Sequence, residues 1–243
     1  MSYDIDICYT CCGMVSKALE KTIGGIPHQR RALSRHEKLM SQRMVASVQS
    51  APQFTTTIDV RVDALVAIKA TLKPKISLTP LILKCVADVL PAYPVLNAAV
   101  DGDELITFEQ INLGVAMDTP TGLRVPVIRE IETLELADIA TQLTELSDKA
   151  RDNRLTLSDM SQGTFTVSNL GMFNVTHFTP IVIPPQTAIL GIGTIHQQVV
   201  VDEDDRVSSA SMMSVSLTSD HRVVDGATAA KFLNALKSRV EAA

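Results

Sequence analysis

Helical patterns of apolar residues recur along this chain and predict five helices. The stretch 33–49 has apolar residues at helical spacing and opens with Ser34 and Glu37 at the spacing of a capping box. The stretch 77–90 is apolar on most faces, so we expect a buried helix there, with Thr79 as its cap and Pro80 at its first position. The predicted helices span residues 33–49, 63–72, 77–90, 133–151 and 227–243.

Short runs of β-branched or alternating residues predict strands between these helices. The turn signals "DGD" and "TPTG" separate two pairs of them. The order of helices, strands, helix, strands and helix is not a regular βαβ alternation, so we expect an α+β domain with a mixed sheet flanked by helices. The predicted strands span residues 53–60, 95–100, 104–108, 111–118, 123–128, 163–171, 177–183, 187–195, 197–201 and 211–219.

Composition narrows the possible functions. The 243 residues suffice for one large domain or two small ones, and an aromatic content of 4% without Trp predicts an aliphatic core. The net charge of −5 and the lack of a Lys/Arg-rich run argue against a nucleic-acid partner. No apolar stretch reaches the roughly 18–20 residues of a membrane span. Neither Gly-x-Gly-x-x-Gly after a strand nor a Walker-type loop is present, so no standard nucleotide site is expected.

The amino-terminal residues lack the basic and apolar regions of a secretory signal. We therefore expect a reducing compartment, either the cytoplasm or, in a eukaryote, the mitochondrial matrix, and free thiols. Cys8, Cys11 and Cys12 form a cluster, but no second Cys/His pair follows at a suitable spacing. We expect no metal site.

Two short stretches carry residues that could do chemistry. His221 precedes Asp225 by four residues, and Gly226 follows, on a predicted connection between a strand and a helix. Histidine can act as a base near neutral pH, although a loop histidine beside a carboxylate also arises by chance. Ser168 and Asn169 lie where a strand enters a turn. A hydroxyl there can donate to an oxyanion, or simply bond its own backbone.

Taken together, several blocks resemble the catalytic domain of the dihydrolipoamide acyltransferases, which form the core of the 2-oxo acid dehydrogenase complexes. The blocks are "DHRVVDGA", "TFTVSNLGMF", "FTPIVIPPQTAILGIG", "TPTGLRVPVIR", "APQFTTTIDVRVDAL" and "YPVLNAAV". The resemblance runs from about Arg31 to the C-terminus. It implies the fold of chloramphenicol acetyltransferase, with the active site at a trimer interface. We therefore expect a catalytic domain over residues 31–243 and an irregular leader of unknown role over residues 1–30.

The resemblance also implies an activity, the transfer of an acyl group between a dihydrolipoyl thiol and coenzyme A. His221 would be the general base, and Ser168 of a neighbouring subunit would donate to the oxyanion. Asp225 would hold the shape of the site through an arginine of the first helix, Arg35 in preference to Arg43. Asn169 and Gly226 would be supporting residues.

The implied partners are two further copies in a homotrimer, which would assemble into a cubic or dodecahedral core with the other components of the complex. Coenzyme A would be a substrate, and the lipoyl group would be carried on another domain or chain. Lys149 follows an Asp, as lipoyl lysines often do, but it lies in a helical pattern and is interpreted as a solvated helix lysine. The chain departs from the family at Ile183, where Asn is usual, and at Asn174, where Gly is usual.

Two other functions stay open at this point. The chain could be a structural core protein with little activity, which its unusual amino-terminal stretch and the missing lipoyl domain suggest. It could also be a free-standing acyltransferase for a small thiol, amine or alcohol. The sequence leaves the acyl group undefined.

Overall fold

The computed structural model describes residues 22–23, 26–201 and 204–243, in two compact units that are described separately. The first unit, which ends at Lys38, contains the paired strands β1 (Thr22–Ile23) and β2 (Ile26–Pro27) and the start of helix α2 (Arg35–Ser50). The backbone N–H of Glu37 donates to the Ser34 hydroxyl (3.2 Å), and the Glu37 carboxylate accepts from the N–H of Ser34 (2.7 Å). The predicted capping box is thus confirmed. The predicted boundary at residue 30 stays a prediction, and the cysteine cluster lies outside the described residues.

The second unit contains the four remaining predicted helices, each close to its expected range. Helix α4 corrects one detail, because it begins at Leu78 with Ser77 as its N-cap rather than Thr79. Pro80 therefore lies within the first turn, where an N–H would have no partner inside the helix. The Thr79 hydroxyl instead accepts a hydrogen bond from the Asn169 amide (3.3 Å). The helices are α3 (Asp63–Thr71), α4 (Leu78–Val89), α5 (Leu136–Arg151) and α6 (Gly226–Glu241).

Short 3₁₀ helices connect several of these elements. They are η1 (Leu90–Ala92), η2 (Pro94–Leu96), η3 (Ile131–Thr133), η4 (Ser158–Met160) and η5 (Gly171–Phe173).

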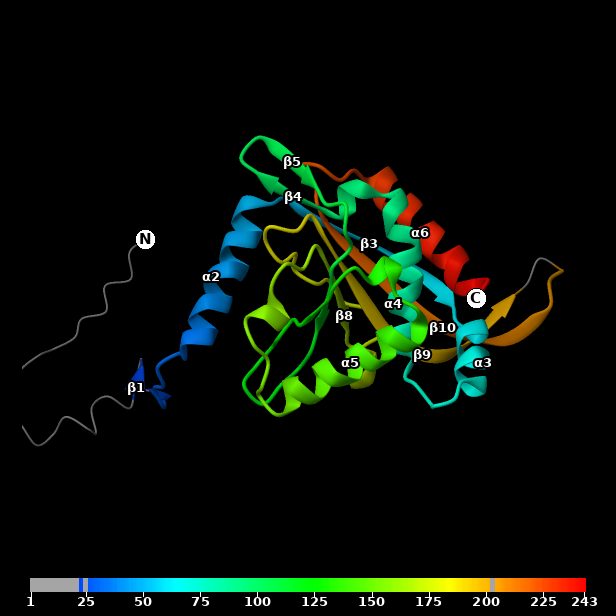
Figure 1. The fold of residues 1–243 in the computed structure, drawn as a ribbon, viewed down its shortest axis with the longest axis horizontal. Coiled ribbons are helices and arrows are strands. Elements are labelled where there is room, and N and C mark those ends of the chain that lie inside the picture. The colour runs from blue at the N-terminus through cyan, green and yellow to red at the C-terminus, as the bar shows by residue number, and fades with distance from the viewer. Residues whose placement is uncertain (1–21, 24–25, 202–203) are drawn as a thin grey trace, which may run out of the picture. The chain divides into compact units, whose positions relative to one another are not determined.

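A six-stranded mixed sheet forms the centre of the second unit, which confirms the α+β class (Figure 1). The strand order is β3-β10-β9-β8-β6-β7; the pairs β9/β8 and β8/β6 are parallel and the others antiparallel. A separate antiparallel pair joins β4 (Ala98–Asp101) to β5 (Glu104–Thr107). The strands of the main sheet are β3 (Gln53–Arg61), β6 (Leu113–Ala116), β7 (Val127–Ile128), β8 (Phe165–Asn169), β9 (Ala188–Val201) and β10 (Val207–Asp220).

The strand predicted over 177–183 is wrong, because this segment has no regular secondary structure. Pro180 lacks the backbone N–H that strand pairing requires. The segment makes its hydrogen bonds to side chains and to irregular backbone rather than to a neighbouring strand. The N–H of Val182 donates to the Gln53 side-chain oxygen (3.1 Å). The strands predicted over 187–195 and 197–201 are one continuous strand, β9.

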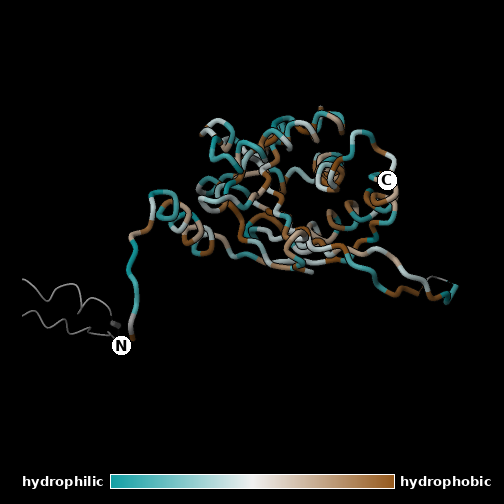
Figure 2. Tube along the Cα trace, turned by 90° about the horizontal axis from the view of Figure 1, so that it is seen from below, coloured by the Kyte–Doolittle hydropathy of each residue, from teal (hydrophilic) through white to brown (hydrophobic). Residues whose placement is uncertain are grey.

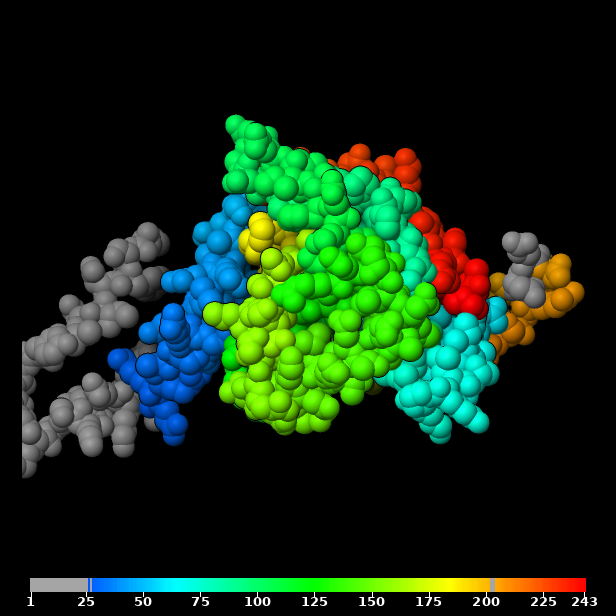
Figure 3. Space-filling view, in the orientation of Figure 1, coloured from blue at the N-terminus to red at the C-terminus, as the bar shows by residue number. Residues whose placement is uncertain are grey.

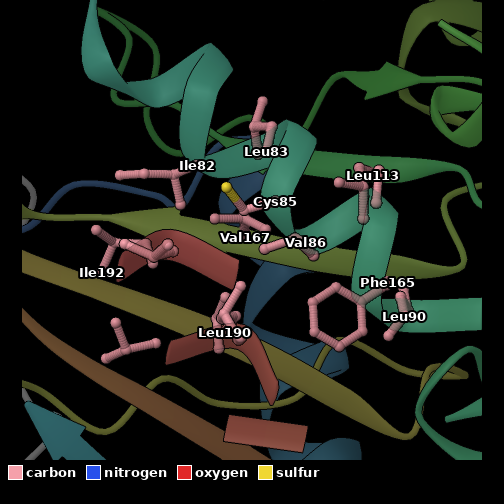
Figure 4. Packing of buried hydrophobic residues seen from close by; sticks show 14 of the residues in the cluster. Ile82, Leu83, Cys85, Val86, Leu90, Leu113, Phe165, Val167, Leu190 and Ile192 are labelled. Atoms are coloured by element: carbon pink, nitrogen blue, oxygen red, sulfur yellow. The ribbon is translucent and has the colours of Figure 1, made fainter. Parts of the chain in front are cut away.

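The helices and the sheet enclose one aliphatic core. Helices α4, α5 and α6 lie along one side of the sheet (Figure 2), and Figure 4 shows side chains of α4 against those of β6, β8 and β9. Phe165 and Phe232 are among the largest side chains that are fully buried there. The core residues of each strand therefore point to the face of the sheet that the helices cover, and the alternate residues point to the opposite face.

That opposite face is polar where β3 pairs with β10. Three side-chain hydrogen bonds cross between the two strands at successive same-face positions, which we call the hydroxyl ladder. It consists of Thr55–Thr218 (2.8 Å), Thr57–Ser216 (2.9 Å) and Asp59–Ser214 (2.6 Å). The hairpin formed by the end of β9 and the start of β10 extends beyond the body of the second unit (Figure 3). Val199, Val201 and Val207 are exposed on it.

Gly193 of β9 allows the segment after η5 to lie close against the sheet. A Cβ atom at this position would overlap the carbonyl oxygen of Thr176. We expect Gly193→Ala to lower the free energy of unfolding by about 1–3 kcal/mol or more, since the clash is with backbone. Urea unfolding measures this. Gly226→Ala is the matched control, because nothing lies within 4 Å of a Cβ there, and an equal loss in both variants would contradict the explanation.

Candidate functional site

His221 lies in the five-residue connection between β10 and α6, as expected. Its backbone N–H donates to the carbonyl oxygen of Pro52 (2.8 Å), which ties the connection to the start of β3. Its imidazole packs against the ring of Phe54, with the ring centroids 4.4 Å apart and the planes tilted by 41°. The side chain is exposed, and no group in the described part of the chain hydrogen-bonds its ring nitrogens. The imidazole is therefore accessible to a substrate.

Two charged residues flank His221 in the sequence and pair with each other. The Asp220 side chain is 3% exposed, and its carboxylate accepts from the Arg222 guanidinium at Nε (3.0 Å) and Nη2 (2.6 Å). The same carboxylate accepts from the backbone N–H of Arg222 (3.0 Å). The hydrogen bond to Asp220 raises the pKa of the Arg222 guanidinium above its usual value. The pair thus closes a turn around His221.

Asp225 is the N-cap of α6, a role the sequence analysis did not assign to it. Its carboxylate accepts from the backbone N–H of Thr228 (2.6 Å), and this hydrogen bond is the main reason that the pKa of Asp225 is lowered. Gly226 is the first residue of the helix. Arg35 is exposed and begins α2 in the first unit, and its pairing with Asp225 stays a prediction.

Ser168 lies in β8, where it is paired with Ala116 on one side and Gly191 on the other. Gly191 is in turn paired with Ser216 of the hydroxyl ladder, so Ser168 lies on the polar face of the sheet. Its side chain is half-buried, and its hydroxyl has no hydrogen-bond partner within the described residues. The hydroxyl is therefore free to donate to another group.

Asn169 holds the turn that follows Ser168. Its side-chain oxygen accepts from the N–H of Gly171 (2.8 Å), and its amide donates to Thr79 of α4 (3.3 Å). Asn174 adopts the left-handed conformation (φ 59°), which explains how Asn replaces the glycine usual there: Asn tolerates this region better than most residues. The backbone after Ser168 is thus fixed by side-chain contacts.

The structure does not bring His221 and Ser168 together within one chain. Ser168 is level with Ser216 across β9, and His221 is five residues further along β10. Strand geometry then separates the two residues by about 17 Å along the sheet and about 10 Å across it. Two side chains cannot meet over that distance. A single reacting carbonyl group could therefore contact both residues only if His221 and Ser168 came from different copies of the chain.

A cavity of about 590 Å³ lies elsewhere in the described part of the chain, between α5 and the segment before α4. None of the predicted site residues lines it. Among the residues that the structure describes, no group of three His, Cys, Asp or Glu side chains is placed to hold a metal ion. Nor does that part of the chain contain a helix long and apolar enough to cross a membrane.

Lys149 is in α5, and its ammonium group pairs with Asp159 (3.0 Å) rather than being fully solvated. Asp159 also accepts from the N–H and hydroxyl of Thr156 (2.8 and 2.7 Å). These hydrogen bonds, first those from Thr156 and then that from Lys149, lower the pKa of Asp159 to about 2. Lys149 thus has a structural partner within its own chain.

This lowered pKa predicts an acid-dependent loss of stability. Because the folded-state pKa is below the usual value of 3.8, Asp159 stabilises the fold above about pH 4, and this contribution is lost as the pH falls toward 2. We expect Asp159→Asn to unfold more easily at pH 6 and to show a shallower decline between pH 4 and 2. The urea concentration at the midpoint of unfolding, measured for both proteins from pH 6 to pH 2, tests this prediction. Parallel curves for both proteins would contradict the assignment.

The sequence analysis did not single out Asp220, Arg222 or Phe54. For Asp220 and Arg222 a signal was present, because they are the two charged neighbours of His221 in the chain. Phe54 could not be recognised from the sequence. It comes close to His221 only because β3 pairs with β10 in a register that places Phe54 opposite Ser219.

Comparison with known sequences identifies close relatives. Residues 26–243 match the family model of the 2-oxoacid dehydrogenases acyltransferase (catalytic domain). The mitochondrial dihydrolipoyllysine-residue acetyltransferase component of the pyruvate dehydrogenase complex of Schizosaccharomyces pombe is 38% identical over 86% of this chain and 45% of its own length. The succinyltransferase component of the 2-oxoglutarate dehydrogenase complex of Bacillus subtilis is 34% identical over 88% of this chain and 54% of its own. This chain spans about half the length of these relatives.

Solved structures share the fold. The Azotobacter vinelandii dihydrolipoamide acetyltransferase, studied for the role of a serine, a histidine and an asparagine in its catalytic mechanism, superposes with a TM-score of 0.85 at 30% identity and 97% coverage of both chains. The cubic core of a pyruvate dehydrogenase multienzyme complex gives the same values. A chloramphenicol acetyltransferase, at 13% identity, a TM-score of 0.50 and coverage of 88% of this chain and 99% of its own, shares the fold alone. This chain belongs to the family of the 2-oxoacid dehydrogenase acyltransferases, whose catalytic domain it contains.

Proposed function

We propose that this chain is a coenzyme A-dependent acyltransferase that moves an acyl group between a dihydrolipoyl thiol and coenzyme A. Its membership of the family supports this activity, as do the names of its acetyltransferase and succinyltransferase relatives. The observation that carries the proposal is that both reactive side chains are available to a substrate. His221 is exposed, and the Ser168 hydroxyl has no partner among the described residues.

His221 acts as the general base in this proposal. A thiol has a pKa near 8.5, so only a small fraction is thiolate at neutral pH. The imidazole accepts the thiol proton while the sulfur attacks the thioester carbonyl carbon, and a tetrahedral oxyanion forms. When this intermediate collapses, the bond to the other sulfur breaks, and the imidazolium returns the proton to that sulfur. One histidine therefore serves both directions of the reaction.

Ser168 donates its hydroxyl hydrogen to the oxyanion. A donor of this kind typically contributes about 2.7–4 kcal/mol to transition-state stabilisation. Since His221 and Ser168 of one chain are too far apart, the serine is supplied by a neighbouring copy. We therefore propose a homotrimer with its active sites between subunits, and a larger core built from trimers. The similarity to a solved cubic core supports the larger assembly.

Asp225 has two roles in the proposed site. It caps α6, and it holds the shape of the site by pairing with Arg35. In the related Azotobacter vinelandii enzyme, the asparagine stands four residues after the histidine, which is also the spacing of Asp225 from His221. Asn and Asp are both good N-caps, so the cap is compatible with either residue.

The acceptor and the cellular setting complete the proposal. The lipoyl group is carried on another domain or another chain, and the other components of the dehydrogenase complex are the partners. The relatives include mitochondrial and bacterial proteins, which supports the mitochondrial matrix or the bacterial cytoplasm.

Steady-state transfer of acetyl groups from acetyl-coenzyme A to free dihydrolipoamide tests the activity. We expect saturable formation of coenzyme A thiol. A trimeric protein that transfers no acetyl group would contradict the acetyltransferase and favour a structural core role. Repeating the assay with succinyl-coenzyme A separates the choice of acyl group from the activity itself. Transfer to alcohols or amines, but not to dihydrolipoamide, would favour a free-standing acyltransferase.

A further inference from the structure

We infer that Asp220 and Arg222 are positioning residues that hold His221 in its reactive orientation. We call the ion pair between them the His221 clamp. The inference rests on the proposed function, in which His221 is the general base. It concerns residues that do not touch the substrate and act through the histidine between them.

Every polar group of Asp220 has a hydrogen-bond partner. The carboxylate receives three N–H groups of Arg222, which are the backbone N–H, Nε and Nη2. The backbone N–H of Asp220 donates to the carbonyl oxygen of Thr187 (2.8 Å). Its carbonyl oxygen accepts from Val223 (3.2 Å) and Val224 (3.0 Å). Asp220 is therefore fixed from both sides, and Arg222 is fixed to it.

His221 has no comparable restraint of its own. Its imidazole has one aromatic neighbour, Phe54, and no hydrogen bond to its ring nitrogens from the described residues. Its orientation is thus set by the backbone on either side of it, which the clamp closes. A misplacement of about 1 Å can cost on the order of 10² in rate when the reacting atoms must be aligned. A rigid turn at this position therefore has a direct effect on catalysis.

The chemistry of the pair favours positioning over a purely structural role. Ending a strand does not require a charge, and burying a carboxylate is unfavourable unless it is paired. A guanidinium binds a carboxylate through two N–H groups in a fixed plane, which restrains orientation as well as distance. Nε and Nη2 of Arg222 make this arrangement with Asp220. The ion pair restrains the two residues between which His221 lies.

The test compares Asp220→Asn and Arg222→Lys with a matched ion pair elsewhere. Asp220→Asn keeps the size and one acceptor but removes the charge, and Arg222→Lys keeps the charge but not the planar pairing. The control variants are Asp88→Asn and Arg239→Lys, since Arg239 also binds Asp88 through Nε (3.0 Å) and Nη2 (2.8 Å). Arg239 is thirteen residues along α6 from Gly226, or about 20 Å. For each protein we would measure kcat, KM and thermal midpoint, and determine the crystal structure.

We expect kcat to fall on the order of 10²-fold in Asp220→Asn and about tenfold in Arg222→Lys, with KM within about threefold. We also expect the His221 imidazole to be displaced or to occupy several orientations in the crystals. The control variants should keep kcat, and they should lose less thermal stability because the Asp88 side chain is 27% exposed and that of Asp220 is 3% exposed. A kcat that falls no more than in the controls, or an unmoved imidazole, would overturn the inference. If the wild type transfers no acyl group, the proposed function fails. The crystal structures alone then test the clamp: a displaced or multiply oriented His221 imidazole in the variants supports it, and an unmoved imidazole contradicts it.

Discussion

Replacing His221 by alanine is expected to reduce acetyl transfer to dihydrolipoamide by about 10²–10⁴-fold, the range typical of a general acid–base group. The loss should appear in kcat, because the missing imidazole removes a proton transfer rather than a binding contact. The fold should be little affected, since the side chain is exposed and its fold contact is with Phe54. Steady-state kinetics of the wild type and the variant, measured side by side, give the comparison.

Two controls make this result specific. His196 of β9 is paired with Met212 far from the β10–α6 connection, so His196→Ala should keep its activity. Sedimentation or light scattering should show that His221→Ala has the same assembly state as the wild type. Turnover within threefold of the wild type, in a correctly assembled variant, would exclude His221 as the base.

Mixing two inactive variants should restore activity. Ser168→Ala alone is expected to lower the rate by about 10²–10³-fold through loss of one oxyanion donor. If each site takes His221 from one copy and Ser168 from the next, a random mixture of His221→Ala and Ser168→Ala chains contains some sites with both residues intact. With equal amounts of the two chains, about a quarter of the sites in cyclic trimers should be intact.

The experiment needs the two variants to be co-expressed with different tags, so that mixed trimers can be purified. Each purified mixed trimer has one intact site of three, so activity near a third of the wild type would support a shared site. A mixture no more active than its separate components would contradict it, because a site built within one chain cannot be rescued by a neighbour. The double variant His221→Ala/Ser168→Ala, mixed with wild type, controls for subunit exchange.

Much of the fold could be predicted from local sequence patterns. The helices and most strands follow from apolar periodicity and cap residues, and the placement of His221 between a strand and a helix followed from its flanking segments. The segment 177–183 was misassigned because its apolar residues resemble a strand, whereas Pro180 lacks the N–H that pairing requires. Such errors arise where one backbone group decides the structure.

The candidate site was less accessible from sequence. The types of its residues could be recognised, but their arrangement depends on strand register, which links distant parts of the chain. The approach of Phe54 to His221 depends on the pairing of β3 with β10, and the separation of His221 from Ser168 depends on two further strand pairings. The N-cap role of Asp225 did have a local signal, an Asp directly before a helical pattern.

The hydroxyl ladder has a consequence for how its face of the sheet interacts with its surroundings. Each of its hydroxyls already has a hydrogen-bond partner within the chain, so covering the ladder would leave none of these hydroxyls unsatisfied. A face of leucines would be driven out of water on first contact and would hold mismatched copies together. Paired threonines and serines give a weaker and more reversible attraction. This part of the sheet therefore has less tendency to hold other molecules non-specifically than an apolar face of the same size.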